Sequence, residues 1–481
     1  MRIVIVGAGP SGICAGVRLL EAGLDDFVLV EKGPGVGGTW RHNTYPGAAC
    51  DIQSALYSFS FAPKVDWSRP YGTQPEILRY MEEVADRFGL LPRCRFGVEV
   101  VGASWDEARS SWTTRLSTGE TLESDVLVSA IGMFNELAYP DIPGLDSFAG
   151  TRFHSARWDW DHDLTGERVA VIGSAASAVQ FVPEIVEQAG PVHLYQRTAN
   201  WVLPKPDTPY TEEQLEAFRS DPALMAALRQ EVYDRAERTV TFSDPEMVAT
   251  NQAIARAAID VVEDPETRTK LIPDHPWGCK RPLLSNNFYP AFNRPNLELV
   301  TEPIDHVDAG GVVSTDGRRR PVDTLILATG FQATRYTSAL DVTGRGGRRL
   351  DDAWRDGAAA YLGVTTAGFP NLFMLYGPNT NNGSILTMIE AQVDHLMSHL
   401  GRLRADGYAW VDVRPAVMER YNDEIQAAIA GVTVWNAGCN GYYRTSSGRV
   451  VTQWPHTMSE FERRARSIDW DSFEYPTAAA G

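Results

Sequence analysis

Residues 2–31 read RIVIVGAGPSGICAGVRLLEAGLDDFVLVE, and this stretch decides the fold class of the chain. The apolar, β-branched runs at 2–6 and 27–30 each predict a buried parallel strand. Apolar residues recur at helical spacing between the two runs, which predicts a connecting helix. A strand, a helix and a second parallel strand form one unit of a doubly wound α/β fold.

The turn after the first strand has the pattern GxGxxG, at Gly7, Gly9 and Gly12. Gly7 permits the tight turn, Gly9 lets the backbone approach a pyrophosphate, and Gly12 permits close packing of the helix on the strand. The N-terminus of the helix adds a positive potential that favours phosphates. Glu31 closes the second strand, where a carboxylate binds the ribose hydroxyls. Together these residues predict a dinucleotide site.

A near copy of this unit occupies residues 168–197. It begins with the apolar run RVAVI, continues through the turn GSAASA, and ends after a second strand. The 24 positions from Gly173 to Arg197 equal the 24 positions from Gly7 to Glu31. A repeat of the same length predicts two Rossmann-like dinucleotide-binding domains in one chain.

The second turn differs from the first in its side chains. After Gly173 and Ser174 it has Ala175 where the first turn has a glycine, so a methyl group holds the pyrophosphate further out. Arg197 stands at the ribose position, where a guanidinium suits a 2′-phosphate, and Thr198 adds a hydroxyl donor. We therefore expect FAD at the first site and NADPH at the second, although a unit that has lost nucleotide binding would have the same pattern.

The remaining segments predict the domain organisation. We expect an FAD-binding domain at 1–140, an NADPH-binding domain at 141–208, a helical insertion at 209–275, a return to the NADPH-binding domain at 276–335, and a return to the FAD-binding domain at 336–481. Asp-Pro pairs at 221–222 and 264–265 predict helix starts inside the insertion. The acidic segment from Asp469 onward is predicted to be a tail.

Composition excludes several classes of protein. The 481 residues include 44 basic and 62 acidic ones, a formal net charge of −18, which disfavours nucleic-acid binding. The sequence contains no run of about 18 apolar residues, so it predicts no membrane-spanning helix. A strand that begins almost at the first residue leaves no room for a signal peptide, so we expect a cytoplasmic protein.

The cysteines point to a reducing compartment. They are odd in number and scattered, and they form no CxxC pair, at Cys14, Cys50, Cys94, Cys279 and Cys439. This pattern argues against a disulfide framework, a zinc cluster and a disulfide reductase. We expect each cysteine to be a small buried apolar residue, and we expect no metal site.

Two longer motifs make the prediction specific. Residues 37–51 read GGTWRHNTYPGAACD, and residues 148–159 read FAGTRFHSARWD. They resemble the two fingerprints of type I Baeyer–Villiger monooxygenases. Further motifs follow the order found in that family and its flavin-monooxygenase relatives, namely YQRTANW at 195–201, CKR at 279–281, FNRPN at 292–296, LATGF at 327–331 and YGPNTNNGSI at 376–385.

The resemblance implies roles for particular residues at the cofactors. Gly38, Thr39 and Trp40 belong to the FAD-binding fingerprint, and the turn with Gly377 and Asn379 faces the flavin. At the other cofactor, Lys280 joins Arg197 at the 2′-phosphate of NADPH. His154 and Trp158 belong to a linker that couples NADPH binding to domain movement. Taken alone, Trp40, His154 and Trp158 are also typical core residues.

The resemblance places Arg281 at the family's active-site arginine, with Asp51 orienting it. The chemistry supports this role. A C4a-peroxyflavin that attacks a ketone as an anion needs a fixed positive charge, and arginine does not give up its proton near neutral pH. The same charge stabilises the alkoxide of the adduct. From the residues alone, Arg281 would also suit a surface ion pair, and Asp51 would suit a turn cap.

These motifs predict an FAD-dependent monooxygenase that consumes NADPH and O2 and converts a ketone to an ester or lactone. The alternatives are a flavin N- or S-monooxygenase, an NADPH oxidase-like flavoprotein, or a redox-sensing binding protein. Many members of the family have Arg where this chain has Ala49 and Glu where it has Gln53, and residues 435–445 differ from the best-known cyclic-ketone enzymes. The sequence therefore leaves the identity of the ketone open.

Overall fold

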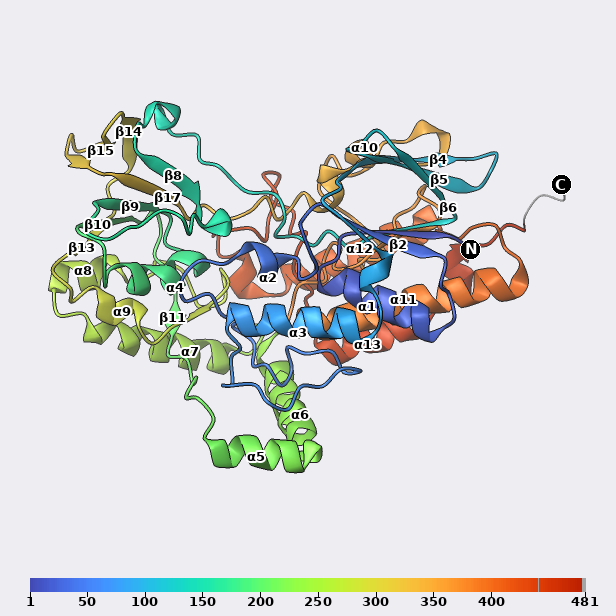
Figure 1. Ribbon diagram of the computed structural model, residues 1–481, viewed down its shortest axis with the longest axis horizontal. Helices are drawn as coiled ribbons and strands as arrows, with labels where there is room; N and C mark the ends of the chain where they lie inside the picture. The colour runs from blue at the N-terminus through green and yellow to red at the C-terminus, as the bar shows by residue number, and fades with distance from the viewer. Residues whose placement is uncertain (440, 478–481) are drawn as a thin grey trace.

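Two parallel five-stranded sheets lie toward opposite ends of the molecule (Figure 1). The computed structural model describes residues 1–439 and 441–477. The first sheet has the order β19 (Leu372–Met374), β7 (Val126–Ser129), β1 (Ile3–Val6), β2 (Phe27–Glu31) and β3 (Cys94–Phe96). The second has the order β13 (Leu297–Val300), β10 (Val192–Tyr195), β9 (Val169–Ile172), β17 (Thr324–Leu327) and β8 (Thr151–His154).

The two sheets repeat one design. The central strands β1 and β9 are buried along their whole length, which explains their continuous apolar sequences. Helix α1 (Pro10–Glu21) connects β1 to β2, and helix α4 (Ala176–Ile185) connects β9 to β10. The predicted pair of doubly wound dinucleotide-binding folds is confirmed. We call the first sheet with its helices the first unit, and the second sheet with its helices the second unit.

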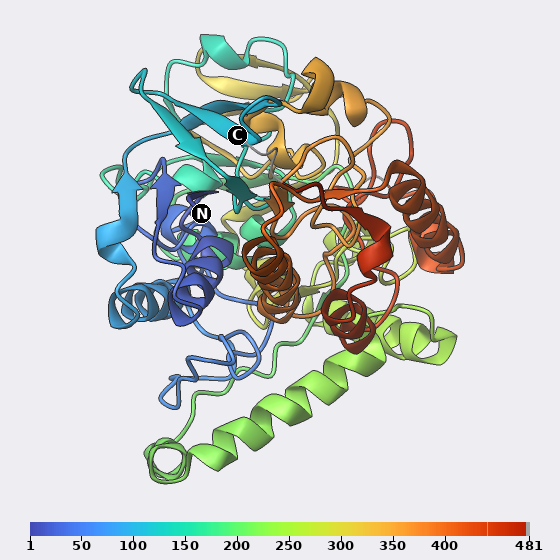
Figure 2. The ribbon, with the colours of Figure 1, turned by 90° about the vertical axis from the view of Figure 1, so that its right-hand side faces the viewer.

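The short strands β11 (Val202–Leu203) and β12 (Leu283–Leu284) pair with each other. Along the chain, a group of helices lies between them. These helices are α5 (Glu212–Ser220), α6 (Pro222–Thr239), α7 (Pro245–Ala258) and α8 (Pro265–Lys270). The predicted helix starts are correct, because Asp221 caps α6 by accepting from the Ala223 amide and Asp264 caps α8 by accepting from the Thr267 amide. Helices α5 and α6 project from the body of the molecule (Figure 2).

The other elements cover the first unit or join the two. Helix α9 (Phe288–Ala291) belongs to the second unit. The other helices belong to the first unit, namely α2 (Thr39–His42), α3 (Gln74–Arg87), α10 (Leu350–Ala353), α11 (Ile385–Asp406), α12 (Pro415–Ala430) and α13 (Met458–Arg466). Two small sheets contain β18 (Asp341–Thr343), β4 (Val100–Asp106), β5 (Ser111–Leu116) and β6 (Thr121–Ser124), and β14 (Ile304–Asp308), β15 (Gly311–Ser314) and β16 (Arg319–Pro321). No helix in the described part of the chain is both long and apolar enough to cross a membrane.

The tail prediction was wrong for residues 470–477, and residues 478–481 lie outside the described residues. Strand β21 (Phe473–Glu474) pairs antiparallel with β20 (Asp412–Val413). Phe473 is buried, and the Tyr475 hydroxyl lies 2.6 Å from Nδ1 of His399 on α11. The acidic residues of this segment predicted exposure to solvent, but its aromatic residues pack it against the core.

Candidate active site

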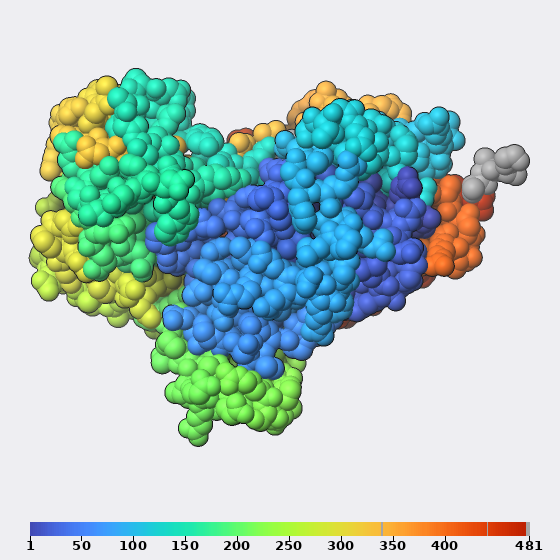
Figure 3. All heavy atoms as spheres, viewed as in Figure 1, coloured from blue at the N-terminus to red at the C-terminus, as the bar shows by residue number. Residues whose placement is uncertain are grey.

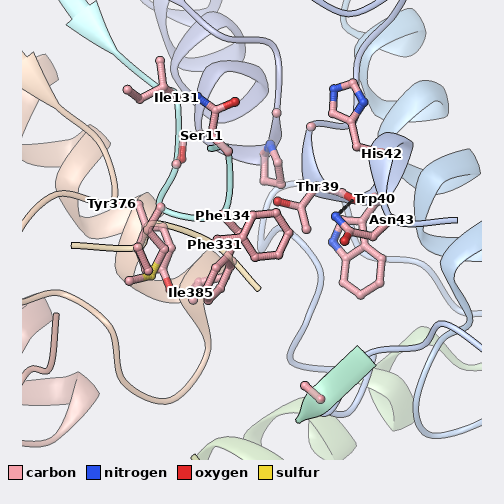
Figure 4. A pocket seen from close by; sticks show the side chains of 18 of the residues that line it. Ser11, Thr39, Trp40, His42, Asn43, Ile131, Phe134, Phe331, Tyr376 and Ile385 are labelled. Atoms are coloured by element: carbon pink, nitrogen blue, oxygen red, sulfur yellow. Dashed lines mark hydrogen bonds between the residues drawn. The ribbon is translucent and has the colours of Figure 1, made fainter. Parts of the chain in front are cut away.

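A cavity of about 410 Å³ lies where the first and second units meet, and both units line it. The space-filling view shows the two units as lobes that join in the middle of the molecule (Figure 3). Figure 4 shows the side chains of Thr39 and Trp40 on one side of the cavity and those of Phe134, Phe331 and Tyr376 on the other. The cavity therefore includes the first predicted dinucleotide site and reaches the turn of the second.

The first glycine turn leaves open space that side chains would fill. Gly7 has φ +105°, and a Cβ atom there would lie 2.6 Å from the Ala130 carbonyl oxygen. A Cβ atom on Gly12 would lie 2.0 Å from the Gly7 oxygen, so only glycine lets the helix start this close to the strand. Gly9 faces Gly38, and a Cβ atom on Gly9 would lie 3.4 Å from the Cα atom of Gly38. These contacts fit the close approach of a pyrophosphate.

The Glu31 carboxylate is fixed by the backbone at the edge of this cavity. It accepts hydrogen bonds from the Ala8 amide at 2.8 Å and the Gly33 amide at 2.7 Å, one on each oxygen. Each oxygen retains a further lone pair for a ribose hydroxyl. Glu31 and the glycine turn together fit the adenosine half of FAD.

The short helix α2 forms the wall beside the turn. Thr39 and Trp40 both line the cavity (Figure 4). The Trp40 indole donates to the Tyr57 hydroxyl at 3.0 Å, and its carbonyl accepts from the Gln74 amide. Trp40 is thereby held rigidly at the cavity edge.

The second turn reproduces the first in backbone conformation. Gly173 has φ +107°, and a Cβ atom there would lie 2.4 Å from the Ala328 carbonyl oxygen. Ala175 lines the cavity, whereas Ser174 is buried and its carbonyl accepts from the Asn200 amide at 3.1 Å. The altered sequence thus keeps the geometry of a dinucleotide-binding turn.

Positive charge gathers beyond this second turn. Arg197 is exposed at the end of β10, and Thr198 beside it is half-buried. Burial lowers the pKa of Lys280, and the charge of Arg197 lowers that pKa further. Two cations close enough to repel each other form a site that an anion stabilises. The Arg197 charge is therefore near enough to act on Lys280.

Arg281 and Asp51 form an ion pair inside the cavity. The Arg281 Nε donates to Asp51 Oδ2 at 2.7 Å, and Nη2 lies 2.6 Å from the same oxygen. About a third of each side chain, 34%, remains exposed. The Asp51 charge raises the pKa of Arg281, so the guanidinium stays charged. Asp51 belongs to the first unit and Arg281 to the segment before β12, so the pair bridges the two units.

A residue that the sequence analysis missed positions Asp51. Gln180 on α4 accepts from the Tyr45 hydroxyl and donates to the Ala49 carbonyl, each at 2.9 Å. Gly47 packs so closely on α4 that a Cβ atom would lie 2.8 Å from the Gln180 carbonyl oxygen. The loop that carries Asp51 is therefore fixed on the second unit. A single glutamine on a helix gives no signal of this role in one sequence.

His154 and Trp158 lie outside the cavity lining. His154 is buried, its Nδ1 accepts from the Ala156 amide at 3.1 Å, and burial lowers its pKa. Trp158 packs edge to face on Phe153 and tilted against Phe181, each at 5.1 Å between ring centroids. His154 is the last residue of β8, and Trp158 lies in the segment that joins β8 to β9.

The turn with Gly377 and Asn379 also stands back from the cavity. The Asn379 amide donates to the carbonyls of Val450 at 3.1 Å and Gln453 at 2.9 Å, so it holds a C-terminal loop. A Cβ atom on Gly377 would lie 2.2 Å from the Gly363 oxygen. The neighbouring residues Tyr376, Asn381, Gly383 and Ile385 line the cavity instead.

An aromatic cluster that the sequence analysis did not assign closes the cavity near Arg281. Phe134 packs against Phe331 at 5.5 Å and Tyr442 at 5.7 Å between centroids. All three line the cavity. The Tyr442 hydroxyl is buried, and it has no hydrogen-bond partner within the described ranges. The motif LATGF contains Phe331, but nothing in the sequence links it to Tyr442.

The cysteine prediction was wrong for two residues. Cys279 and Cys439 form a disulfide, with their Cα atoms 6.1 Å apart and 160 positions between them. Cys14, Cys50 and Cys94 are free thiols. The local spacing rules used for the prediction detect pairs that are close in sequence, so they missed a pair that only the folded chain brings together.

Comparison with known proteins agrees with this site. Residues 4–257 match the family model described as pyridine nucleotide-disulphide oxidoreductase. The chain is 41% identical to a Baeyer–Villiger monooxygenase of Streptomyces coelicolor over 98% of this chain and 92% of that one, and 41% identical to one of Pseudomonas aeruginosa over 99% and 92%.

Solved structures show the same likeness. An oxidised steroid monooxygenase bound to NADP superposes with a TM-score of 0.89 at 32% identity, over 99% of each chain. A cyclohexanone monooxygenase from Rhodococcus sp. Phi1 bound to NADP+ superposes with a TM-score of 0.90 at 30% identity, again over 99% of each. The chain therefore belongs to the Baeyer–Villiger monooxygenase family, and it is an FAD- and NADPH-dependent flavoprotein monooxygenase.

Proposed function

We propose that this monooxygenase inserts an oxygen atom from O2 beside the carbonyl of a ketone, at the cavity next to Arg281, and releases an ester or a lactone. The observation that carries the proposal is the Arg281–Asp51 ion pair, which places a permanent positive charge in a cavity lined by both units. Oxygenation of a sulfide or amine has less need of this charge, because no alkoxide forms.

The first unit holds FAD in this proposal. Gly7, Gly9 and Gly12 admit its pyrophosphate, and Glu31 binds its ribose hydroxyls. Gly38, Thr39 and Trp40 bound the space toward the flavin. When bound, FAD accepts a hydride from NADPH and activates O2.

The second unit holds NADPH. Gly173, Ser174 and Ala175 form the turn at its pyrophosphate, and the helix α4 contributes its positive N-terminus. Arg197 and Lys280 share the 2′-phosphate, with the Thr198 hydroxyl beside them. The mutual repulsion that lowers the pKa of Lys280 supports this assignment, because a phosphate between the two cations relieves it.

Arg281 and Asp51 act on the substrate. Asp51 holds Nε and Nη2 of Arg281 through one oxygen, so Nη1 is the guanidinium nitrogen that turns toward the substrate. It donates to the ketone oxygen and stabilises the negative charge that develops there. Because Asp51 is itself fixed through Gln180, the donor is oriented before the substrate binds.

The domain division follows the same plan. The FAD-binding domain comprises 1–140 and 336–481, and the NADPH-binding domain comprises 141–208 and 276–335, with the helices of 209–275 as an insertion. His154 and Trp158 lie in the strand-to-strand link of the NADPH-binding domain, where they transmit its movement. We place the enzyme in the cytoplasm, where NADPH is regenerated.

The test is product analysis of the FAD-loaded enzyme with NADPH, isotopically labelled O2 and a panel of ketones together with a sulfide. We expect one labelled oxygen atom in an ester or lactone. Arg281→Ala should lower the rate of ester formation by about 10²–10³-fold, the usual loss for a donor that stabilises a developing oxyanion. Arg219→Ala, which removes an exposed ion pair on α5, serves as the control and should change nothing.

Two outcomes would contradict the proposal. One is hydrogen peroxide in amounts equal to the NADPH consumed, with every ketone tested. The other is labelled sulfoxide without labelled ester, which would assign the enzyme to heteroatom oxygenation.

A further inference from the structure

The Cys279–Cys439 disulfide joins two loops that flank the active-site arginine. Cys279 is buried and lies two positions before Arg281. Cys439 lies three positions before Tyr442, whose ring lines the cavity. The disulfide thus connects the segment that carries the guanidinium to the segment that closes the cavity beside it.

The two loops lie against each other around this bond. A Cβ atom on Gly441 would lie 3.9 Å from Cγ of Lys280. The hydroxyls of Tyr442 and Tyr443 are near enough to influence the pKa of Arg281, after the larger effects of Asp51 and burial. The loop of residues 276–282 and the described residues of the loop 432–445 (432–439 and 441–445) therefore form one wall of the site.

Noncovalent contacts between these loops are few. Phe242 packs against Trp277 at 5.2 Å and against Trp435 at 6.1 Å, so a third segment mediates the contact. Among the residues that the structure describes, no hydrogen bond or ion pair joins 276–282 to 432–445. Within the described residues, the Cys279–Cys439 disulfide is the covalent link between the two loops.

Small thiols can reach this bond, while the other cysteines do not compete with it. Cys439 is half-buried and Cys279 is buried, so a thiol would approach the bond from the side of Cys439. Cys14 and Cys50 are buried, and burial raises the pKa of each thiol, which disfavours the reactive thiolate. Cys94 lies on β3 at the edge of the first sheet, in another part of the molecule.

We propose that Cys279 and Cys439 are positioning residues of the active site: their disulfide holds the Arg281 loop against the Tyr442 loop, and thiol–disulfide exchange releases it. A dithiol attacks the bond and displaces one cysteine as its thiol, and its second thiol then displaces the other. The dithiol becomes a cyclic disulfide, so two electrons and two protons pass to the protein. Oxidised glutathione reverses the change and leaves as two molecules of the reduced thiol.

The expected consequence concerns the yield of ester rather than the consumption of NADPH. The Asp51 carboxylate holds Arg281 in both states, but only in the oxidised state is the Arg281 loop bonded covalently to the Tyr442 loop. A displacement of about 1 Å in a positioned group can cost up to about 10²-fold, so we expect roughly ten-fold less ester per NADPH in the reduced enzyme. At saturating NADPH its oxidation should change little, because Arg197 and the second turn lie outside the released loop. The KM for NADPH should rise modestly, because Lys280 belongs to that loop. This inference rests on the ketone oxygenation proposed above.

The experiment compares one unaltered protein in two states. The FAD-loaded enzyme is oxidised with glutathione disulfide or reduced with dithiothreitol and then freed of reagent. Peptide mapping without reductant should find Cys279 linked to Cys439 in the first sample. Ester per NADPH should fall on reduction and recover on reoxidation, and amide hydrogen exchange in 276–282 and 432–445 should rise on reduction.

Variants separate positioning from mere stability. Cys279→Ser and Cys439→Ser should match the reduced enzyme and no longer respond to glutathione disulfide, whereas Cys94→Ser should respond like the parent. A disulfide with only a structural role would lower the melting temperature on reduction and leave ester per NADPH unchanged, which would overturn the proposal. Free thiols at both positions after oxidation would overturn it as well. Absence of ester in both states would instead contradict the proposed function, and hydrogen exchange would still decide whether the bond restrains the loops.

Discussion

Gly9 and Ala175 occupy equivalent positions in the two turns and adopt nearly the same backbone conformation. Gly9 has φ −75° and ψ −170°, and Ala175 has φ −90° and ψ −157°. These angles suit any residue, so the backbone does not require glycine at this position. Packing within the protein does not require it either, because a Cβ atom on Gly9 would lie 3.4 Å from Cα of Gly38, an ordinary van der Waals distance. A glycine at this position therefore leaves space for the pyrophosphate rather than for the fold.

At the third position of the first turn, by contrast, packing within the protein requires glycine. Gly12 has no room for a methyl group, since a Cβ atom would lie 2.0 Å from the Gly7 oxygen. Ala178 occupies the equivalent position in the second unit and is fully buried there. The helix α4 must therefore start further from its strand than α1 does. The first positions, Gly7 and Gly173, are alike in both conformation and close contact with a following strand.

The largest effect is expected for Gly12→Ala. The new methyl group has no flexible side chain to displace, because its neighbour is backbone. We expect a loss of about 3 kcal/mol or more in the free energy of unfolding, at the upper end for overpacking, together with loss of bound FAD. Urea unfolding and the FAD content of the purified protein measure both. The reciprocal change Ala178→Gly should cost only about 1 kcal/mol through helix propensity, and equal losses for both would break the comparison.

The next effect concerns Arg197, which stands where the first unit has Glu31. Arg197→Ala removes charge-assisted hydrogen bonds of about 1.5–3 kcal/mol each, so the KM for NADPH should rise roughly 10–100-fold. The KM for NADH, which lacks the 2′-phosphate, should stay the same. Steady-state kinetics with both nucleotides test this, and Arg197→Lys should lose less. An equal rise for NADH would show that Arg197 supports the fold of the site rather than the phosphate.

A smaller effect is expected in the pH dependence of NADPH binding. The pKa of Lys280 is lowered, so this residue loses its charge at a lower pH than an ordinary lysine. Affinity for NADPH should therefore fall as pH rises through that pKa. In Arg197→Ala the repelling charge is absent, the pKa of Lys280 rises, and the fall should move to higher pH. The ratio of KM values for NADPH and NADH, measured from about pH 6 to about pH 10, shows the shift. If Arg197→Ala does not shift this pH profile, the charge of Arg197 does not act on Lys280, and the prediction fails.

The smallest effect is expected for Ala175→Gly. The backbone angles already suit both residues, so the fold should not change. Removal of one methyl group lets the pyrophosphate approach the turn, and we expect the KM for NADPH to fall by a factor of about 2–3, a few tenths of a kcal/mol. A rise in KM would show that the methyl group contacts the nucleotide favourably.

Local patterns predicted much of this molecule. The strands β1 and β9, their glycine turns and the Asp-Pro helix starts are encoded within a few residues, and all appear as expected. The pairing of Arg281 with Asp51 followed from family motifs, because 230 positions separate them.

The features that sequence reasoning missed depend on contacts between distant segments. Gln180 is an ordinary helix residue until the loop of Asp51 packs on it. The Cys279–Cys439 bond, the Tyr442 wall and the pairing of β21 likewise exist only once the chain has folded. No periodicity or spacing in a single sequence records such contacts, so they lie beyond pattern analysis.

The place of β19 in the chain has a consequence for synthesis on the ribosome. This strand pairs with β7, yet the chain builds the entire second sheet between them. A growing chain can therefore complete the sheet of β9 while the sheet of β1 still lacks an edge. The waiting edge of β7 is apolar and parallel, the kind of surface on which nascent chains aggregate. Slow translation after β17 would prolong this exposure, so we expect expression at low temperature with a chaperone to raise the soluble yield.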